Sequence, residues 1–125
     1  MKITVVKEFS FDAAHHLPGY NGMCANVHGH HYILQIGIKG EINDDIGMVI
    51  DFSELKKEVN DSIISHLDHQ NLNELDVLDF PNLMPTAENM VGWIVEKFQE
   101  KWYRSGLVFV RLYETPTSYV EWRAE

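Results

Sequence analysis

Cysteine is scarce in this sequence: Cys24 is the only one among 125 residues. A single cysteine excludes an internal disulfide framework, and it also excludes a metal site built from several thiolates. The thiol is then either a small buried side chain or a reactive group. The polar loop around it, residues 17–26, favours the reactive group.

Basic residues are also few. Lys and Arg number 10 against 19 Asp and Glu, which gives a formal net charge of −9. This charge argues against nucleic acid as a partner, because a basic surface supplies most of the affinity for phosphates. An anionic substrate would need a local cation, and a bound metal ion would provide one.

Long apolar runs are absent. No stretch approaches the roughly 18–20 apolar residues that a membrane span needs. The first residues alternate between apolar and polar side chains, without the continuous apolar segment of a signal peptide. Hydrophobic residues still make up 45% of the chain, which is enough for a core. We therefore expect one cytoplasmic domain over residues 1–125, with no membrane partner.

Apolar and polar residues alternate in four segments, which predicts four strands near 3–13, 30–39, 107–113 and 118–123. Helical spacing predicts a helix over 54–66, with Ser53 as its N-cap. Its inner stripe is Leu55, Val59, Ile63 and Leu67. A second helix begins at Thr86, the predicted N-cap, and ends near Gly106. Its inner stripe is Val91, Val95, Phe98 and Trp102.

This order of elements predicts an α+β domain: a four-stranded antiparallel sheet with two helices packed on one face. Such a sheet leaves two edge strands whose backbone groups need cover. Association with further copies of the chain is one way to cover them.

Histidines are concentrated near the N-terminus, where five of the seven fall within residues 15–31. His28 and His30 are two residues apart on a predicted strand, so their side chains point to the same side. His15 ends the first strand on the parity of its apolar face and would supply a third ligand if the two strands are neighbours. Three protein ligands with one open position are typical of a catalytic zinc site, and imidazoles suit zinc.

Two alternatives remain for the His-Gly-His segment. Instead of belonging to the three-histidine zinc site, it could be a chance pair in a histidine-rich stretch or the start of a cupin-type site. A cupin site expects a Glu four or five residues later, where this sequence has Leu34 and Gln35. The cupin alternative is therefore the weaker one.

Other residues have functional and ordinary explanations side by side. Cys24 precedes His28 by four residues, and a nearby dication favours the thiolate that could act as a base. Asp68 and His69 could transfer a proton, or they could be the solvated end of a helix. Glu114 shares the parity of an apolar strand face and needs a partner there, either a ligand with paired N–H groups or a basic side chain.

Taken together, these segments resemble the 6-pyruvoyl-tetrahydropterin synthase / 6-carboxy-tetrahydropterin synthase family over nearly the whole chain. Six motifs occur in the family's order: FDAAHHL, CANVHGHHY, GMVIDFSELK, LDHQNLN, PTAEN and YET. Two positions depart from the pattern. His16 stands where many members have Arg, and TPTSYVEWR lacks the cysteines of some relatives, which leaves the phosphate contacts open.

The resemblance implies a set of roles for residues of this chain. Zinc would be bound by His15, His28 and His30. Catalysis would use Cys24, Asp68 and His69. The pterin would be held by Glu114, with Thr86 and Glu88 supporting that pocket. The resemblance also implies the T-fold, a homohexamer of two stacked trimers, active sites between subunits and 7,8-dihydroneopterin triphosphate as the substrate.

Two products are known in this family, 6-pyruvoyl-tetrahydropterin and 6-carboxy-tetrahydropterin. Three residues separate Cys24 from His28, a spacing that resembles the carboxy branch, which leads to queuosine and other 7-deazapurines. The sequence therefore predicts the carboxy product, with the pyruvoyl product as the alternative. A sister aldolase or cyclohydrolase would not need the three histidines, and a non-catalytic metal-binding module would not need Cys24, Asp68 or Glu114.

Overall fold

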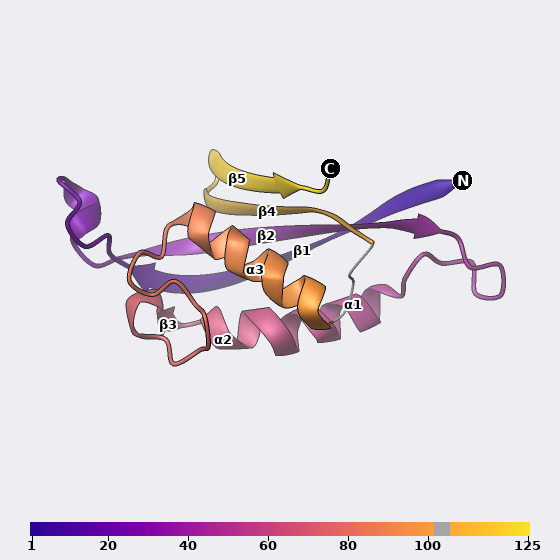
Figure 1. The fold of residues 1–125 in the computed structure, drawn as a ribbon, viewed down its shortest axis with the longest axis horizontal. Helices are drawn as coiled ribbons and strands as arrows, with labels where there is room; N and C mark the ends of the chain where they lie inside the picture. Colours follow the sequence, from indigo (N-terminus) through magenta and orange to yellow (C-terminus); the bar gives the residue numbers. More distant parts are fainter. Residues whose placement is uncertain (102–105) are drawn as a thin grey trace.

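The computed structural model describes residues 1–101 and 106–125 as an α+β domain in which helices cover one side of a twisted sheet (Figure 1). The strands are β1 (Lys2–His15), β2 (His28–Glu41), β3 (Gln70–Asn71), β4 (Leu107–Thr115) and β5 (Ser118–Arg123). The helices are α1 (Phe52–Val59), α2 (Ser65–Leu67) and α3 (Ala87–Lys101). Short single-turn helices cover Met23–Ala25 and Leu72–Glu74. None of the helices in this described part is both long and apolar enough to cross a membrane.

The sheet has five strands in the order β3-β1-β2-β4-β5, so the prediction of four strands was wrong by one. The four long strands are antiparallel neighbours, as alternation predicted. The additional strand, β3, has two residues and pairs in parallel with Ala13 and Ala14 of β1. A segment this short has no alternation that could reveal it. The rest of β1 has no partner strand on that side in the described sheet, and β5 is the other edge.

Alternation along the strands gives the sheet two different faces. We call the side that packs on the helices the helix face; Phe11, Tyr32, Leu34, Ile36 and Leu112 are buried there. We call the opposite side the open face; Asp12, His31, Gln35 and Arg111 lie on it. The β1–β2 ladder pairs Asp12 with His31 on the open face and Ala13 with His30 on the helix face.

The first helical segment runs from α1 through a π-helical turn, Asn60–Ile64, into α2. Its predicted stripe of Leu55, Val59, Ile63 and Leu67 is fully buried. Apolar residues every four positions drift around an ordinary helix of 3.6 residues per turn, and a wider π turn offsets that drift. The N-cap is Asp51, not Ser53: the Asp51 carboxylate accepts a 2.7 Å hydrogen bond from the Ser53 N–H.

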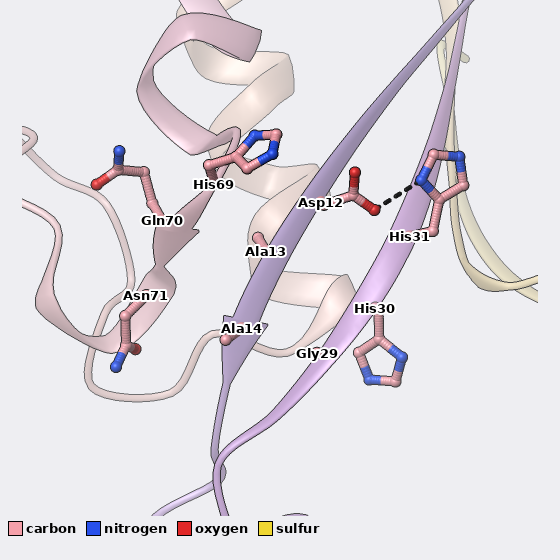
Figure 2. Close-up of a pocket in the computed structure, with 9 residues that line it drawn as sticks. All are labelled: Asp12, Ala13, Ala14, Gly29, His30, His31, His69, Gln70 and Asn71. Carbon is pink, nitrogen blue, oxygen red and sulfur yellow. Dashed lines mark hydrogen bonds and ion pairs between the residues drawn. The ribbon is translucent and has the colours of Figure 1, made fainter.

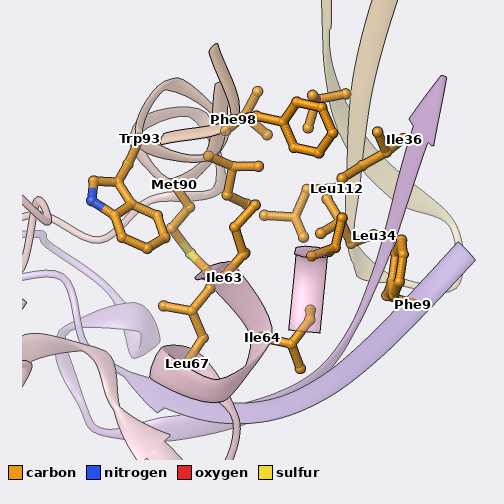
Figure 3. Close-up of a cluster of buried hydrophobic side chains, with 14 of the residues drawn as sticks. Phe9, Leu34, Ile36, Ile63, Ile64, Leu67, Met90, Trp93, Phe98 and Leu112 are labelled. Carbon is orange, nitrogen blue, oxygen red and sulfur yellow. The ribbon is translucent and has the colours of Figure 1, made fainter. Parts of the chain in front are cut away.

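The second long helix, α3, begins as predicted. The Thr86 hydroxyl accepts a hydrogen bond from the Asn89 N–H at 3.2 Å, which is the geometry of an N-cap. Three members of its predicted stripe, Val91, Val95 and Phe98, are buried, while Trp102 lies outside the described residues. Figure 3 shows Met90 of α3 beside Ile63 and Phe98 directed towards the strands, so one core holds both helices on the sheet.

Candidate metal centre

Three imidazoles converge at the end of the sheet where β1 ends and β2 begins. The ladder pairs His15 directly with His28, and His30 follows two residues later on the same face. The ring centroids are 4.7 Å (His15–His28), 5.1 Å (His15–His30) and 4.9 Å (His28–His30) apart. One ring nitrogen of each lies within 4.8 Å of the others. The structure thus brings together the three residues that the sequence proposed as ligands.

Two of these rings are oriented by main-chain carbonyls. His15 Nδ1 lies 2.8 Å from the Pro85 oxygen, and His28 Nδ1 lies 2.7 Å from the Asn26 oxygen. A carbonyl only accepts, so each Nδ1 must carry the proton, which leaves the Nε2 lone pair of the neutral ring free. Donation of the second ring N–H to a carbonyl is the usual arrangement around metal-bound histidines.

The third ring, His30, carries a polar atom without a hydrogen-bond partner among the described residues. Its Nε2 is buried and has no hydrogen bond within the described parts of the chain. Burial lowers the pKa of His30, and the neighbouring His15 and His28 lower it too, while Glu114 acts in the opposite direction. A neutral imidazole with an unused, buried lone pair beside two oriented ones fits a divalent cation bound between them.

A carboxylate stands beside the cluster. Glu114, near the end of β4, places Oε1 3.8 Å from His30 Nε2 and Oε2 4.0 Å from His15 Nε2. Its side chain is 33% exposed. It also lines a cavity of about 120 Å³, together with Ala87, Glu88, Ser118, Tyr119 and Val120. The structure therefore places Glu114 between the imidazoles and a small pocket, and it places Glu88 in that pocket.

Thr86 does not line this pocket. Its hydroxyl caps α3, and its main-chain oxygen accepts from the Met90 N–H at 2.9 Å. Thr86 follows Pro85, whose oxygen orients His15. Its contribution in this chain is to hold the N-terminus of α3 next to the cluster.

Tyr32 is a neighbour of the cluster that the sequence did not single out as a site residue. Its ring stacks on Phe11 at 4.9 Å and meets His30 edge-on at 5.5 Å. The hydroxyl is buried and unpaired within the described residues. Burial raises the pKa of Tyr32 and the nearby Glu114 charge raises it further, so the hydroxyl remains protonated. Alternation along β2 could not distinguish this position from an ordinary apolar one.

Asp68 and His69 form a hydrogen-bonded pair, although adjacent residues seldom bond each other well. His69 has a positive φ of 60°, and its Nδ1 lies 3.0 Å from Asp68 Oδ1. The main chain of Asp12 holds the pair: its N–H donates to Asp68 Oδ1 at 3.0 Å, and its oxygen accepts from the His69 N–H at 2.6 Å. The hydrogen bond from Asp12 is the main reason that the pKa of Asp68 is lowered.

The side-chain ligand atoms of this pair group with Asp12 and not with the three imidazoles. His69 lines a second cavity, of about 570 Å³, whose other lining residues include Asp12, His31, Gln70, Asn71 and also His30 of the cluster. In Figure 2, β1 runs between His69 and His30. On the open face of the sheet, the Asp12 carboxylate accepts a hydrogen bond from His31 Nδ1 at 2.8 Å (Figure 2). The sequence analysis missed Asp12 and His31, which only the register of β1 and β2 brings together.

Cys24 lies in the single-turn helix Met23–Ala25 and is half-buried. The Leu17 N–H donates to its main-chain oxygen at 2.7 Å, which closes the loop between β1 and β2. A cavity of about 360 Å³ is lined by Met23, Cys24, Asn26, Val27 and His28. Cys24 and one histidine of the cluster therefore line the same cavity.

The fold is the T-fold of the pterin synthases, as the comparison with solved structures shows. The profile of the 6-pyruvoyl tetrahydropterin synthase family matches residues 4–125. The chain belongs to this family.

Relatives of both functional branches are similar to this chain. A 6-carboxy-5,6,7,8-tetrahydropterin synthase of Synechocystis is 37% identical over 118 residues, 91% of this chain and 88% of the relative. A 6-pyruvoyl tetrahydrobiopterin synthase of Dictyostelium discoideum is 36% identical over 104 residues, 83% and 76% of the two chains. Among solved structures, the Caenorhabditis elegans 6-pyruvoyl tetrahydropterin synthase superposes with a TM-score of 0.87 at 30% identity, covering 100% of this chain and 97% of the other.

Proposed function

We propose that this chain is a zinc-dependent 6-carboxy-tetrahydropterin synthase of the cytoplasm, acting on the route to queuosine and other 7-deazapurines. It would convert 7,8-dihydroneopterin triphosphate and water into 6-carboxy-5,6,7,8-tetrahydropterin, acetaldehyde and triphosphate. The observation that carries the proposal is the cluster of His15, His28 and His30, with the buried and unpartnered Nε2 of His30, beside a carboxylate that borders a small pocket.

Zinc is the proposed metal because the donor set is three imidazoles. Imidazole suits zinc, and three protein ligands with an open position are the pattern of its catalytic sites. Bound there, zinc would supply a Lewis acid that stabilises negative charge on the side-chain oxygens of the substrate. The carbonyls of Pro85 and Asn26 keep the His15 and His28 lone pairs directed into the cluster.

Glu114 would anchor the pterin. A carboxylate can accept two parallel, charge-assisted hydrogen bonds from the 2-amino group and an adjacent ring N–H. The cavity that Glu114 shares with Glu88 supports this role, because it lies directly beside the imidazoles. Thr86 would act indirectly, by capping the helix that positions Glu88.

Proton transfer would use two separate groups. Cys24 would remove a proton from the side-chain carbon as a thiolate, from the cavity that it shares with His28. Asp68 and His69 would move the second proton, with Asp68 orienting the imidazole at 3.0 Å. Because β1 separates this pair from the cluster within one chain, we propose that it serves the site of a neighbouring subunit in a hexamer. The unpaired edges of β1 and β5 support such an assembly.

The choice of product rests on the loop that carries the thiol. The three residues between Cys24 and His28 resemble the short spacing of the carboxy branch, and a short loop would place the thiol differently against the side-chain carbons. The 6-pyruvoyl-tetrahydropterin synthase activity remains the second candidate, because relatives of the two branches are 37% and 36% identical to this chain.

Mass spectrometry of the products of 7,8-dihydroneopterin triphosphate tests the proposal. We expect 6-carboxy-tetrahydropterin with an equal amount of acetaldehyde. Pyruvoyl-tetrahydropterin without acetaldehyde would establish the second candidate instead. A wild-type protein that binds zinc but forms neither product would be a metal-binding module. A Glu114→Ala variant that reacts as fast as wild type would show that Glu114 does not anchor the pterin.

A further inference from the structure

The carboxylate of Glu114 lies beside two imidazoles of the cluster and also lines the small pocket. Its two oxygens lie near two different rings: Oε1 is 3.8 Å from His30 Nε2, and Oε2 is 4.0 Å from His15 Nε2. An ion among three imidazole nitrogens lies about 2.0–2.1 Å from each, and the edge of a tetrahedron of that size is about 3.3 Å. The observed separations exceed this edge by less than about 1 Å, a distance that a side-chain rotation covers.

The rest of the surroundings leaves the carboxylate available for such a move. In the described parts of the chain, its oxygens form ion-pair contacts with these two imidazoles. The side chain is 33% exposed, and the cavity of about 120 Å³ adjoins it on the side of Glu88 and Tyr119. A buried site of three neutral imidazoles would leave a dication's charge uncompensated, and an adjacent carboxylate would compensate half of it.

We propose that Glu114 is the fourth ligand of the metal when no pterin is bound, and that it leaves the metal when the pterin N–H groups bind its oxygens. The second half of this inference rests on the proposed function, because it takes the pterin as the occupant of the pocket. Docking of the pterin ring would then open the metal position that the side-chain oxygens of the same molecule need.

This exchange has a thermodynamic consequence. The metal and the pterin ring compete for one carboxylate, so each weakens the binding of the other by the same factor. A pterin whose side chain carries hydroxyl groups offsets the loss by supplying new metal ligands, whereas 6-methylpterin cannot. The two compounds should therefore differ in their effect on metal affinity.

Cobalt(II) in place of zinc provides a probe, because its visible absorption reports its ligands. Without pterin, the wild-type spectrum should stay constant between about pH 6 and pH 9, since a carboxylate in the fourth position does not titrate there. In Glu114→Gln, water should replace the carboxylate and ionise near pH 7, so the spectrum should change across this range. Glu88→Gln is the matched control, because it neutralises the other carboxylate of the cavity. Without pterin, its cobalt spectrum should be as independent of pH as that of wild type.

Two further measurements complete the test. Chelator competition should show that Glu114→Gln binds the metal about tenfold or more weakly, while Glu88→Gln does not. Saturating 6-methylpterin should make the wild-type cobalt spectrum pH-dependent. A wild-type spectrum that titrates like that of Glu114→Gln would overturn the ligand role, and a spectrum unchanged by 6-methylpterin would overturn the exchange. Equal cobalt binding by wild type and His28→Ala would instead refute the three-histidine site itself.

Discussion

Replacing Gly37 with Ala should destabilise the protein, because this position of β2 has no room for a methyl group. An ideal Cβ on Gly37 would lie 2.2 Å from Phe109 Cε2 and 2.4 Å from Cδ2, where carbon atoms normally pack at about 3.5–4.0 Å. The Phe109 ring cannot move freely, since the guanidinium groups of Arg111 and Arg123 each lie 5.2 Å from its centroid. The ring must shift by more than about 1 Å and lose part of these contacts.

Overpacking of this kind costs about 1–3 kcal/mol, and weakened cation–π contacts add about 0.5–1 kcal/mol. We expect the free energy of unfolding to fall by about 1.5–4 kcal/mol in urea titrations at one fixed protein concentration. Gly92→Ala is the matched control: a Cβ there meets nothing within 4 Å, and alanine in α3 should stabilise by about 0.5–1 kcal/mol. A Gly37→Ala variant as stable as wild type would refute the packing argument.

Three other predictions concern the site and the assembly. Cys24→Ser should keep its metal and lose most turnover of the triphosphate substrate, because a hydroxyl is far less acidic than a thiol; a near-normal rate would place the base elsewhere. Because the pKa of Asp68 is lowered on folding, its charged form stabilises the folded state at pH values above 3.8, the ordinary pKa of this group. This contribution is lost as the pH falls through the folded-state pKa. The difference in urea midpoint between wild type and Asp68→Asn should therefore shrink as the pH falls from about 6 to about 3, and a difference independent of pH would contradict this assignment. Light scattering should give a hexamer, and a fully active monomer would exclude a site shared between subunits.

The long elements of the fold were predictable because their patterns are long. Four strands and two helices follow from alternation and from spacing of about four residues, and both helices cover one face as expected. The fifth strand was not predictable, because Gln70 and Asn71 pair with β1 only through tertiary placement. The N-cap was misplaced by two residues because Asp51 and Ser53 are both good capping residues, and only the backbone at Asp51 decides between them.

The site was predictable where spacing along a strand determines it. His28 and His30 share a face because side chains alternate, and the same parity indicated His15 and Glu114, to which the resemblance added specific roles. The contacts made by the main chain could not be predicted from the sequence. They are the carbonyls that orient His15 and His28, and the Asp12 backbone that holds Asp68. The positive φ of His69, which allows its bond to Asp68, also depends on the surrounding structure.

The metal content of two neighbouring variants tests the central claim most directly. His30 and His31 are adjacent in β2, but His30 points into the imidazole cluster and His31 bonds Asp12 on the open face. Elemental analysis after dialysis should find one zinc per chain in wild type and in His31→Ala, and almost none in folded His30→Ala. Equal zinc in His30→Ala and His31→Ala would contradict a site built from His15, His28 and His30.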